Sequence, residues 1–278
     1  MQLEPIDDLE DPRLAGYRSL KDAELAARHG RFVVEGRGNV VFLLARSAYA
    51  PESILLGERA WSALEPQIRS AAPACPVFIA PQPLLDAIVG FPIHRGALAL
   101  CRRKPPRDPL ELARSTLAQD PAPRILALEG LIDHDNVGGI FRSAMAFGAR
   151  GVVLSPRSCD PLYRKAIRTS MGGALCVPFA RAPHWPAVLG SLADLGYEIL
   201  ALDPGREGVG IGEIDPARLG AAVLLLGTEG SGLSEAALAR ADRRIRIGME
   251  PGVDSLNVSV AAGIALHRLR RDEPAPGT

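Results

Sequence analysis

The chain has 278 residues, of which 47% are hydrophobic and 23% charged, and its 32 basic and 32 acidic residues give a formal net charge of zero. These values are typical of a globular protein that buries a sizeable core. No run of about 18 apolar residues predicts a membrane span, and the acidic start MQLEPIDDLEDPR lacks the apolar segment of a signal peptide. We therefore expect a cytoplasmic protein without a membrane partner.

The cysteines favour neither disulfides nor a metal site. They are scattered, no two form a CxxC pair, and no histidine stands at ligand spacing from Cys75, Cys101, Cys159 or Cys176. Basic residues gather in the stretches 102–107 and 157–168. Arginine suits phosphate contacts, but a GC-rich genome also supplies it without a functional cause, so charge alone leaves nucleic-acid binding open.

Residues 1–104 alternate helical and strand patterns and predict a small α/β domain in which we find no catalytic cluster. Proline and basic residues concentrate over 101–124, which predicts a linker over 105–123 with one or two helical turns. The elements expected before it are a helix over 19–30, a strand over 31–36, a helix over 40–47, strands over 53–57 and 75–80, and a closing segment over 91–103.

Residues 124–278 show apolar runs separated by helical patterns, which predicts a buried parallel sheet between helices. Asp160, Ser234 and Ser255 are well placed to cap the second, fourth and fifth of these helices. The expected strands span 124–130, 151–155, 175–180, 198–203, 222–227 and 243–248, and the expected helices span 136–148, 160–173, 184–196, 234–242 and 255–271.

Four loops at the expected carboxyl ends of strands, where parallel sheets bind ligands, are unusual: 129–139, 202–213, 226–235 and 248–257. The loop LGTEGSGLSE is neither a GxGxxG turn nor a P-loop, and Glu229 in it would oppose a phosphate. Its glycines let backbone amides approach a neutral or cationic ligand closely. By itself, such a loop is more often a plain glycine-rich turn.

The stretch DHDNVGGIFRSAMAFGA, residues 133–149, predicts a helix that starts near Asn136. Its helical spacing leaves Arg142 either in solvent or in a site. The apolar side of this helix is formed by Val137, Ile140, Phe141 and Ala144. The small residues over 261–265 in the last expected helix allow close packing against another helix or another subunit.

The segments DNVGGIFRSAMAFGARGVVLS, LLLGTEGSGLSE and IRIGMEPGVDSLNVSVAAGIAL occur in this order. They closely resemble the three motifs of the SpoU/TrmH family of RNA ribose 2′-O-methyltransferases, in the SPOUT superfamily. The match covers 124–271, and DPLYRKAIRTSMGG resembles a further Arg/Ser-Gly segment of the family. More loosely, GRFVVEG and FPIHRGALAL resemble the ribosomal-protein-like substrate-binding domain that precedes many such domains.

This resemblance implies an α/β C-terminal domain with a deep trefoil knot, a homodimer, S-adenosyl-L-methionine as cofactor, no metal, and rRNA or tRNA as substrate. Carried onto this chain, the cofactor contacts are Leu202, Gly227, Thr228, Gly230, Ile247, Met249 and Leu256. The catalytic set is Asn136, Arg142, Glu229, Ser255 and Asn257. Two residues depart from the family pattern, Thr228 at a frequent Asn and Gly248 at a usual Pro, and we expect them to affect cofactor affinity or loop stiffness.

In the family, the arginine of the first motif is proposed to take the proton of the ribose 2′-hydroxyl. A guanidinium with a pKa above about 12 is hard to deprotonate, so we favour a role for Arg142 in stabilising the developing oxyanion and holding a neighbouring phosphate. Asn136 and Glu229 would orient Arg142, while Ser255 and Asn257 would position backbone and ribose. RNA would engage the N-terminal domain and the basic segment 157–168.

Two alternatives to an RNA methyltransferase are an RNA-binding protein without activity and a nucleotide-dependent oxidoreductase. A non-catalytic RNA-binding protein with a SPOUT-like domain is disfavoured because all five residues of the catalytic set are present. A nucleotide-dependent oxidoreductase is disfavoured because no GxGxxG turn follows an early strand.

Overall fold

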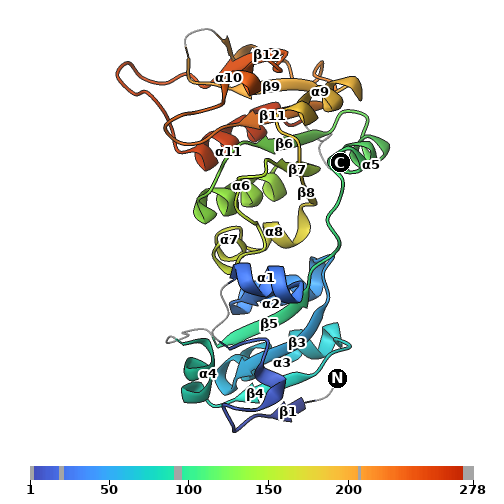
Figure 1. Ribbon diagram of the computed structural model, residues 1–278, viewed down its shortest axis with the longest axis vertical. Helices are drawn as coiled ribbons and strands as arrows, with labels where there is room; N and C mark the ends of the chain where they lie inside the picture. The colour runs from blue at the N-terminus through green and yellow to red at the C-terminus, as the bar shows by residue number, and fades with distance from the viewer. Residues whose placement is uncertain (1–2, 19–21, 91–95, 206–207, 272–278) are drawn as a thin grey trace, which may run out of the picture. The chain divides into compact units, whose positions relative to one another are not determined.

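A computed structural model describes residues 3–18, 22–90, 96–205 and 208–271 (Figure 1). The chain forms two compact units, which we describe separately. The N-terminal unit comprises the described parts of 1–105 together with 160–176, and the C-terminal unit comprises 106–159 and the described parts of 177–278. The segment 160–176 therefore lies with the N-terminal unit, although the sequence pattern had assigned it to the C-terminal domain.

The N-terminal unit is built on a mixed sheet with the strand order β1-β4-β3-β5-β2. In this sheet β5 pairs antiparallel with both β2 and β3, whereas β4 pairs parallel with β3 and β1. The elements are β1 (Leu3–Pro5), α1 (Asp22–His29), β2 (Arg31–Glu35), α2 (Arg37–Arg46), β3 (Pro51–Gly57), α3 (Glu58–Ala71), β4 (Val77–Ala80), α4 (Gln82–Val89) and β5 (Ala97–Arg102). The expected elements of this region are confirmed where they are described; residues 19–21 and 91–95 lie outside the described ranges.

The segment 160–176 carries the short helices α7 (Arg164–Thr169) and α8 (Gly173–Cys176). Arg164 donates from Nε to Asp22 Oδ1 at 3.0 Å, and Ser47 Oγ donates to the carbonyl of Leu175 at 3.0 Å. These contacts explain why the segment joins the N-terminal unit. The expected cap at Asp160 is wrong: the N-cap of α7 is Tyr163, three residues later, and the Asp160 carboxylate instead accepts from the backbone N–H of Leu162.

The C-terminal unit contains a parallel sheet with the order β10-β12-β9-β11-β6-β7-β8, which confirms the predicted fold class. Its strands are β6 (Arg124–Leu128), β7 (Gly151–Leu154), β8 (Phe179–Arg181), β9 (Glu198–Leu202), β10 (Val209–Gly210), β11 (Ala222–Leu226) and β12 (Arg243–Arg246). Its helices are α5 (Pro109–Gln119), α6 (His134–Ala146), α9 (Ala187–Asp194), α10 (Glu235–Leu238) and α11 (Val258–Leu269). The central strands are buried on both faces, because helices cover both sides of the sheet.

One face of this sheet is covered by α5, α9 and α10, whose Leu112, Leu189 and Ala237 join the main core cluster. Figure 1 shows α6 and α11 on the opposite side. The linker expected over 105–123 is wrong in its central part. Asp108 caps α5 by accepting from two backbone N–H groups, and the apolar face of α5 is buried in the core.

Helices α6 and α11 cross closely through small residues. A Cβ on Gly139 would lie 2.8 Å from Ser259 Cβ, and a Cβ on Gly263 would lie 3.1 Å from Ser143 Oγ. The close packing expected for the small residues of the last helix is thus provided by α6. This crossing brings the start of α11 next to the start of α6, so polar residues at the two helix starts lie close together.

Candidate functional site

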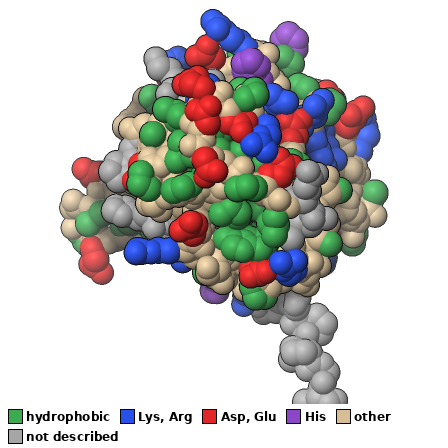
Figure 2. Space-filling model, turned by 90° about the horizontal axis from the view of Figure 1, so that it is seen from below, with side chains coloured by type: hydrophobic (Ala, Val, Ile, Leu, Met, Phe, Trp, Pro, Cys, Tyr) green, Lys and Arg blue, Asp and Glu red, His purple; other side chains and the backbone are tan. Residues whose placement is uncertain are grey.

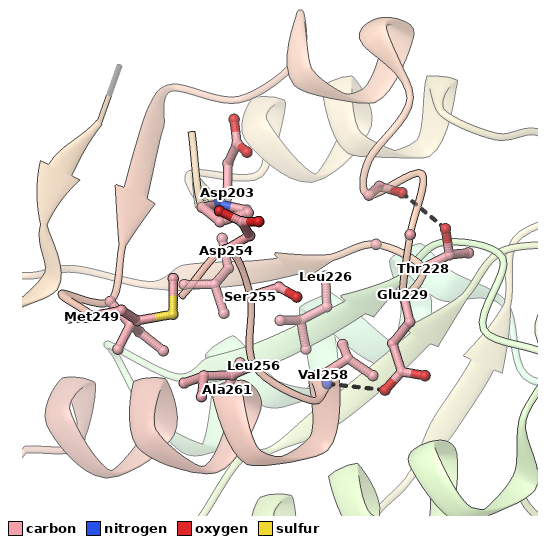
Figure 3. A pocket seen from close by; sticks show the side chains of 16 residues that line it. Asp203, Leu226, Thr228, Glu229, Met249, Asp254, Ser255, Leu256, Val258 and Ala261 are labelled. Carbon is pink, nitrogen blue, oxygen red and sulfur yellow. Dashed lines mark hydrogen bonds between the residues drawn. The ribbon is translucent and has the colours of Figure 1, made fainter. Parts of the chain in front are cut away.

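A pocket of about 300 Å³ opens at the carboxyl ends of three adjacent parallel strands of the C-terminal unit (Figure 3). Its walls come from 202–204 after β9, 226–232 after β11, and 247–256 after β12, and the first turn of α11 closes it. Parallel strands direct all their following loops to one edge of the sheet, so segments far apart in sequence meet there. All seven predicted cofactor residues line this pocket: Leu202, Gly227, Thr228, Gly230, Ile247, Met249 and Leu256.

The loop after β11 needs its glycines for its own shape. A Cβ on Gly227 would lie only 2.4 Å from the backbone of Gly232. Thr228 and Gly232 exchange two backbone hydrogen bonds, of 3.1 and 3.0 Å. Gly230 and Gly232 have φ of 102° and 67°, a region that favours glycine. The loop is therefore a tight, self-bonded turn that presents its backbone to the pocket.

Asn257 links the start of α11 to two other segments. Its Nδ2 donates to Asn136 Oδ1 at 2.8 Å and to Glu229 Oε1 at 2.6 Å. Its Oδ1 accepts from the backbone N–H groups of Ser259 and Val260, which makes Asn257 the N-cap of α11. The Asn257 side chain thus caps the start of α11 and also binds two other predicted catalytic residues, Asn136 and Glu229.

The expected cap at Ser255 is wrong, since α11 begins two residues beyond the position that Ser255 could cap. Ser255 is exposed and lines the pocket. The other expected cap, Ser234, is confirmed: its Oγ accepts from the backbone N–H of Ala237 at the start of α10. The pattern of small polar residues therefore predicted the helix starts to within two or three positions. Which residue caps each helix depends on the tertiary packing.

Asn136 is buried in the first turn of α6, whose N-cap is Asp133. The predicted apolar side of α6 is buried as expected. Arg142 lies on the same helix about 9 Å further along the axis. It is exposed, and within the described part of the chain it makes no hydrogen bond or ion pair. Asn136 and Glu229 thus hold Asn257, and they do not contact Arg142 as the sequence interpretation expected.

The described lining of the pocket contains three carboxylates, those of Asp203, Glu229 and Asp254, and no lysine, arginine or histidine. Asp203 accepts from the backbone N–H of Gly205 at 3.1 Å and lies 3.8 Å from the Arg244 guanidinium. In Figure 3, Asp203 and Asp254 occupy one side of the pocket, and Glu229 extends toward the N–H of Val258 at the other. This lining favours a neutral or cationic ligand over a phosphate.

Sequence reasoning missed several lining residues, chiefly the acidic ones at 203 and 254 and the apolar ones at 226 and 258. A signal for Asp203 was present, because it directly follows an apolar strand at the end where ligands bind. For Asp254 the signal was weaker: it lies in the loop 248–257 that was singled out, but six residues beyond the end of the expected strand. No group of three or more potential metal ligands occurs among the described residues.

Comparisons with known proteins agree with this architecture. Residues 123–267 match the SpoU rRNA Methylase family. An uncharacterized tRNA/rRNA methyltransferase of Mycobacterium bovis is 34% identical over 285 residues, covering 100% of this chain and 96% of the relative. Another, of Mycolicibacterium gilvum, is 34% identical over 92% of this chain and 83% of its own length.

Solved structures share the fold. An AdoMet-bound rRNA methyltransferase from Sinorhizobium meliloti superposes with a TM-score of 0.77 at 21% identity, covering 97% of this chain and 98% of that one. The AdoMet complex of the SpoU methyltransferase AviRb from Streptomyces viridochromogenes gives 0.74 at 20% identity, covering 93% and 97%. Fold, site and family match together define the class of this chain as an RNA methyltransferase. The chain belongs to the SpoU rRNA methylase family.

Proposed function

We propose that this chain transfers a methyl group from S-adenosyl-L-methionine to a ribose 2′-hydroxyl of rRNA or tRNA. The observation that carries the proposal is the convergence of all seven predicted cofactor positions on one pocket, with the Asn136–Asn257–Glu229 group at its edge. A protein that only binds RNA would not need this polar group beside a pocket shaped by a glycine-rich turn. The non-catalytic alternative is therefore disfavoured.

The pocket fits the cofactor in size and in charge. A cavity of about 300 Å³ is within the usual range for small-molecule sites. When bound, S-adenosyl-L-methionine supplies the transferred methyl group from a positively charged sulfonium. The carboxylates of Asp203, Glu229 and Asp254 favour a positively charged ligand, and Leu202, Leu226 and Ile247 offer apolar surface to its uncharged parts.

The polar residues around the pocket divide into two groups. Asn257, held by Asn136 and Glu229, fixes the first turn of α11 and so keeps the pocket wall in place. Arg142 is exposed and has its donors available for a substrate. We assign Arg142 to the ribose: it stabilises the 2′-oxygen as negative charge develops there and holds the adjacent phosphate. Ser255, exposed on the pocket wall, contacts the incoming nucleotide.

RNA binding by the N-terminal unit is supported by cations that lie over aromatic rings. The Arg46 guanidinium lies 5.9 Å from the Phe42 ring centre, and Lys104 Nζ lies 5.5 Å from that of Tyr49. Aromatic and cationic side chains together suit bases and phosphates. The face of this unit seen in Figure 2 has acidic and basic side chains interspersed, and it is less suited to a polyanion.

The basic segment 157–168 contributes less than its sequence suggests. Arg164 pairs with Asp22, and Arg168 Nη1 lies 3.7 Å from Glu35. We keep the two domains that the resemblance implies, but we move the start of the second one into the expected linker. Residues 1–104 form the substrate-binding part, and the methyltransferase part begins at α5.

The homodimer belongs to the same proposal. Helix α11 exposes Val260 and Ile264, at 51% and 40%, one turn apart, and Ile132 before α6 is 71% exposed. Apolar side chains at this spacing form one stripe on a helix, which suits a second copy of this chain. We also propose that the trefoil knot implied by the resemblance to the family is present. No described helix is long and apolar enough to cross a membrane, and we propose a cytoplasmic location.

The test compares 2′-O-methylation maps of total RNA from cells with and without this gene. We expect one or a few rRNA or tRNA positions to lose the modification and to regain it when RNA from the deletion strain is incubated with purified protein and S-adenosyl-L-methionine. Identical maps, together with no transfer in vitro, would contradict the proposal. Thermal stabilisation by S-adenosyl-L-methionine but not by NAD separates it from the oxidoreductase alternative.

A further inference from the structure

Glu129 directly follows β6 and lies outside the pocket lining, yet it contacts both ends of the glycine loop that forms one pocket wall. Its backbone N–H donates to the carbonyl of Leu226, the residue before the loop, at 2.8 Å. Its carboxylate accepts from the backbone N–H and the hydroxyl of Ser234, the residue after the loop, at 2.9 and 2.8 Å. Glu129 therefore binds both residues that flank the 227–233 loop, Leu226 and Ser234.

The carboxylate of Glu129 also accepts from Trp185 Nε1 at 2.8 Å. Three donors thus converge on its two oxygens: Oε1 accepts from Trp185 and from the Ser234 hydroxyl, and Oε2 accepts from the Ser234 N–H. A carboxylate can accept all three, whereas the NH₂ group of a glutamine would have to face a donor in either orientation. The position therefore requires an acid rather than a polar residue in general.

Within the loop, the hydrogen bonds between Thr228 and Gly232 give the turn its shape. The exposed Glu229 side chain attaches the tip of the loop to the start of α11 through Asn257. Attachment at the far end comes from Ser234 and from the partial packing of Leu233 on the core cluster. From these contacts we propose that Glu129 is a positioning residue, which holds the 227–233 loop in the form that accepts the methyl donor. This inference rests on the proposed function.

The test measures the dissociation constant of S-adenosyl-L-methionine by calorimetry for the full chain and for Glu129→Gln. We expect the constant to rise about tenfold, since charge-assisted hydrogen bonds at the loop end are lost. The KM for the cofactor should rise in parallel, while kcat at saturation stays within about twofold, because cofactor binding restores the loop. Hydrogen exchange of the amides at 228 and 232 in the free protein should accelerate.

A matched control is Glu198→Gln. Glu198 is also half-buried, begins β9 at the opposite edge of the same sheet, and is paired with Arg243. This change removes one charge and one ion pair, so its effect on melting temperature should be similar. It should leave cofactor affinity and loop exchange unchanged. Trp185→Phe removes one donor to Glu129 without touching the loop and should also keep the affinity within about twofold.

Failure of the inference can be told from failure of the proposed function. If the parent chain does not bind S-adenosyl-L-methionine, the proposed function is wrong. If the parent chain binds it and Glu129→Gln binds it equally well, with unchanged loop exchange, the positioning role is wrong. If Glu129→Gln does not fold, Glu129→Ala and Ser234→Ala are measured instead. Ser234→Ala removes only the hydroxyl bond to Glu129 and keeps the backbone N–H bond, so its effect on cofactor affinity should be the smaller of the two. Unchanged cofactor affinity and unchanged loop exchange in both variants overturn the inference.

Discussion

The two edges of the sheet in the C-terminal unit use polar residues for opposite purposes. At the amino-terminal edge, Arg124 is buried and donates to five backbone carbonyls, including those of Leu269 at 2.9 Å and Ala122 at 2.8 Å. Burial lowers the pKa of its guanidinium. At the carboxyl edge, Asn257 and Glu229 are exposed beside an open pocket.

This difference shows how polar groups divide between stability and function. A buried cation whose donors all meet carbonyls has none left for a ligand, so Arg124 can only hold the chain together. At the carboxyl edge, Asn257 and Glu229 are bonded to each other but stay exposed, so they can shape the pocket wall and contribute less to stability than a buried network. Four substitutions test this division.

The largest effect is expected for Arg142→Ala. Removing the donor that meets the developing charge should lower kcat by about 1,000-fold. The side chain is exposed and lies outside the pocket lining, so cofactor affinity and melting temperature should be unchanged. Single-turnover methyl transfer and calorimetry measure these quantities. Full activity in this variant would remove Arg142 from the catalytic set, and Arg150→Ala, also exposed near the end of α6, provides the control.

Arg124→Met should cause the largest loss of stability, roughly 3 kcal/mol, because several buried carbonyls lose their donor. Urea denaturation measures this loss. The corresponding change at exposed Arg244, Arg244→Met, should cost less than about 1 kcal/mol. Protein that remains folded should bind S-adenosyl-L-methionine with unchanged affinity. A clear loss of affinity would mean that the two edges are not independent.

Gly227→Ala should weaken cofactor binding without affecting the rest of the unit. The added Cβ would meet the backbone of Gly232 at 2.4 Å, so the turn must open, at a cost of about 2 kcal/mol or a roughly 30-fold higher dissociation constant. Gly220→Ala is the control, because its Cβ would meet nothing within 4 Å. Equal affinities for the two variants would show that the turn does not shape the pocket.

Two substitutions of Asn257 separate its role as the N-cap of α11 from its hydrogen bonds to Asn136 and Glu229. Asn257→Ala should lose about 1 kcal/mol of stability with the N-cap. Asn257→Asp keeps an acceptor for the N–H groups of Ser259 and Val260 and should regain part of that stability, because its second oxygen faces the Glu229 carboxylate and is repelled by it. It cannot donate to Asn136 or Glu229, so methyl transfer should remain impaired. Recovery of both stability and activity in the aspartate variant would mean that only the cap matters.

Much of the sheet could be predicted because buried parallel strands are continuous apolar runs, such as AVLLL over Ala222–Leu226. Short elements were harder. Helix α5 was interpreted as part of a linker because its prolines and charges mark its ends and its exposed face, while Leu112 and Ala113 are buried. Only packing against the sheet distinguishes these two cases.

By itself, the sequence determined the alternation of strands and helices in the C-terminal unit, the three motif segments, and seven of the residues that line the pocket. It could do so because apolar periodicity and glycine-rich loops are patterns of consecutive residues. The tertiary structure alone decided which polar atoms meet. It made Asn257 rather than Ser255 the cap of α11, joined Asn136 and Glu229 to Asn257 rather than to Arg142, and brought Glu129 to the glycine loop. These contacts join residues up to 121 positions apart. Which residues meet depends on how the helices and strands pack, and a local sequence pattern does not determine that packing.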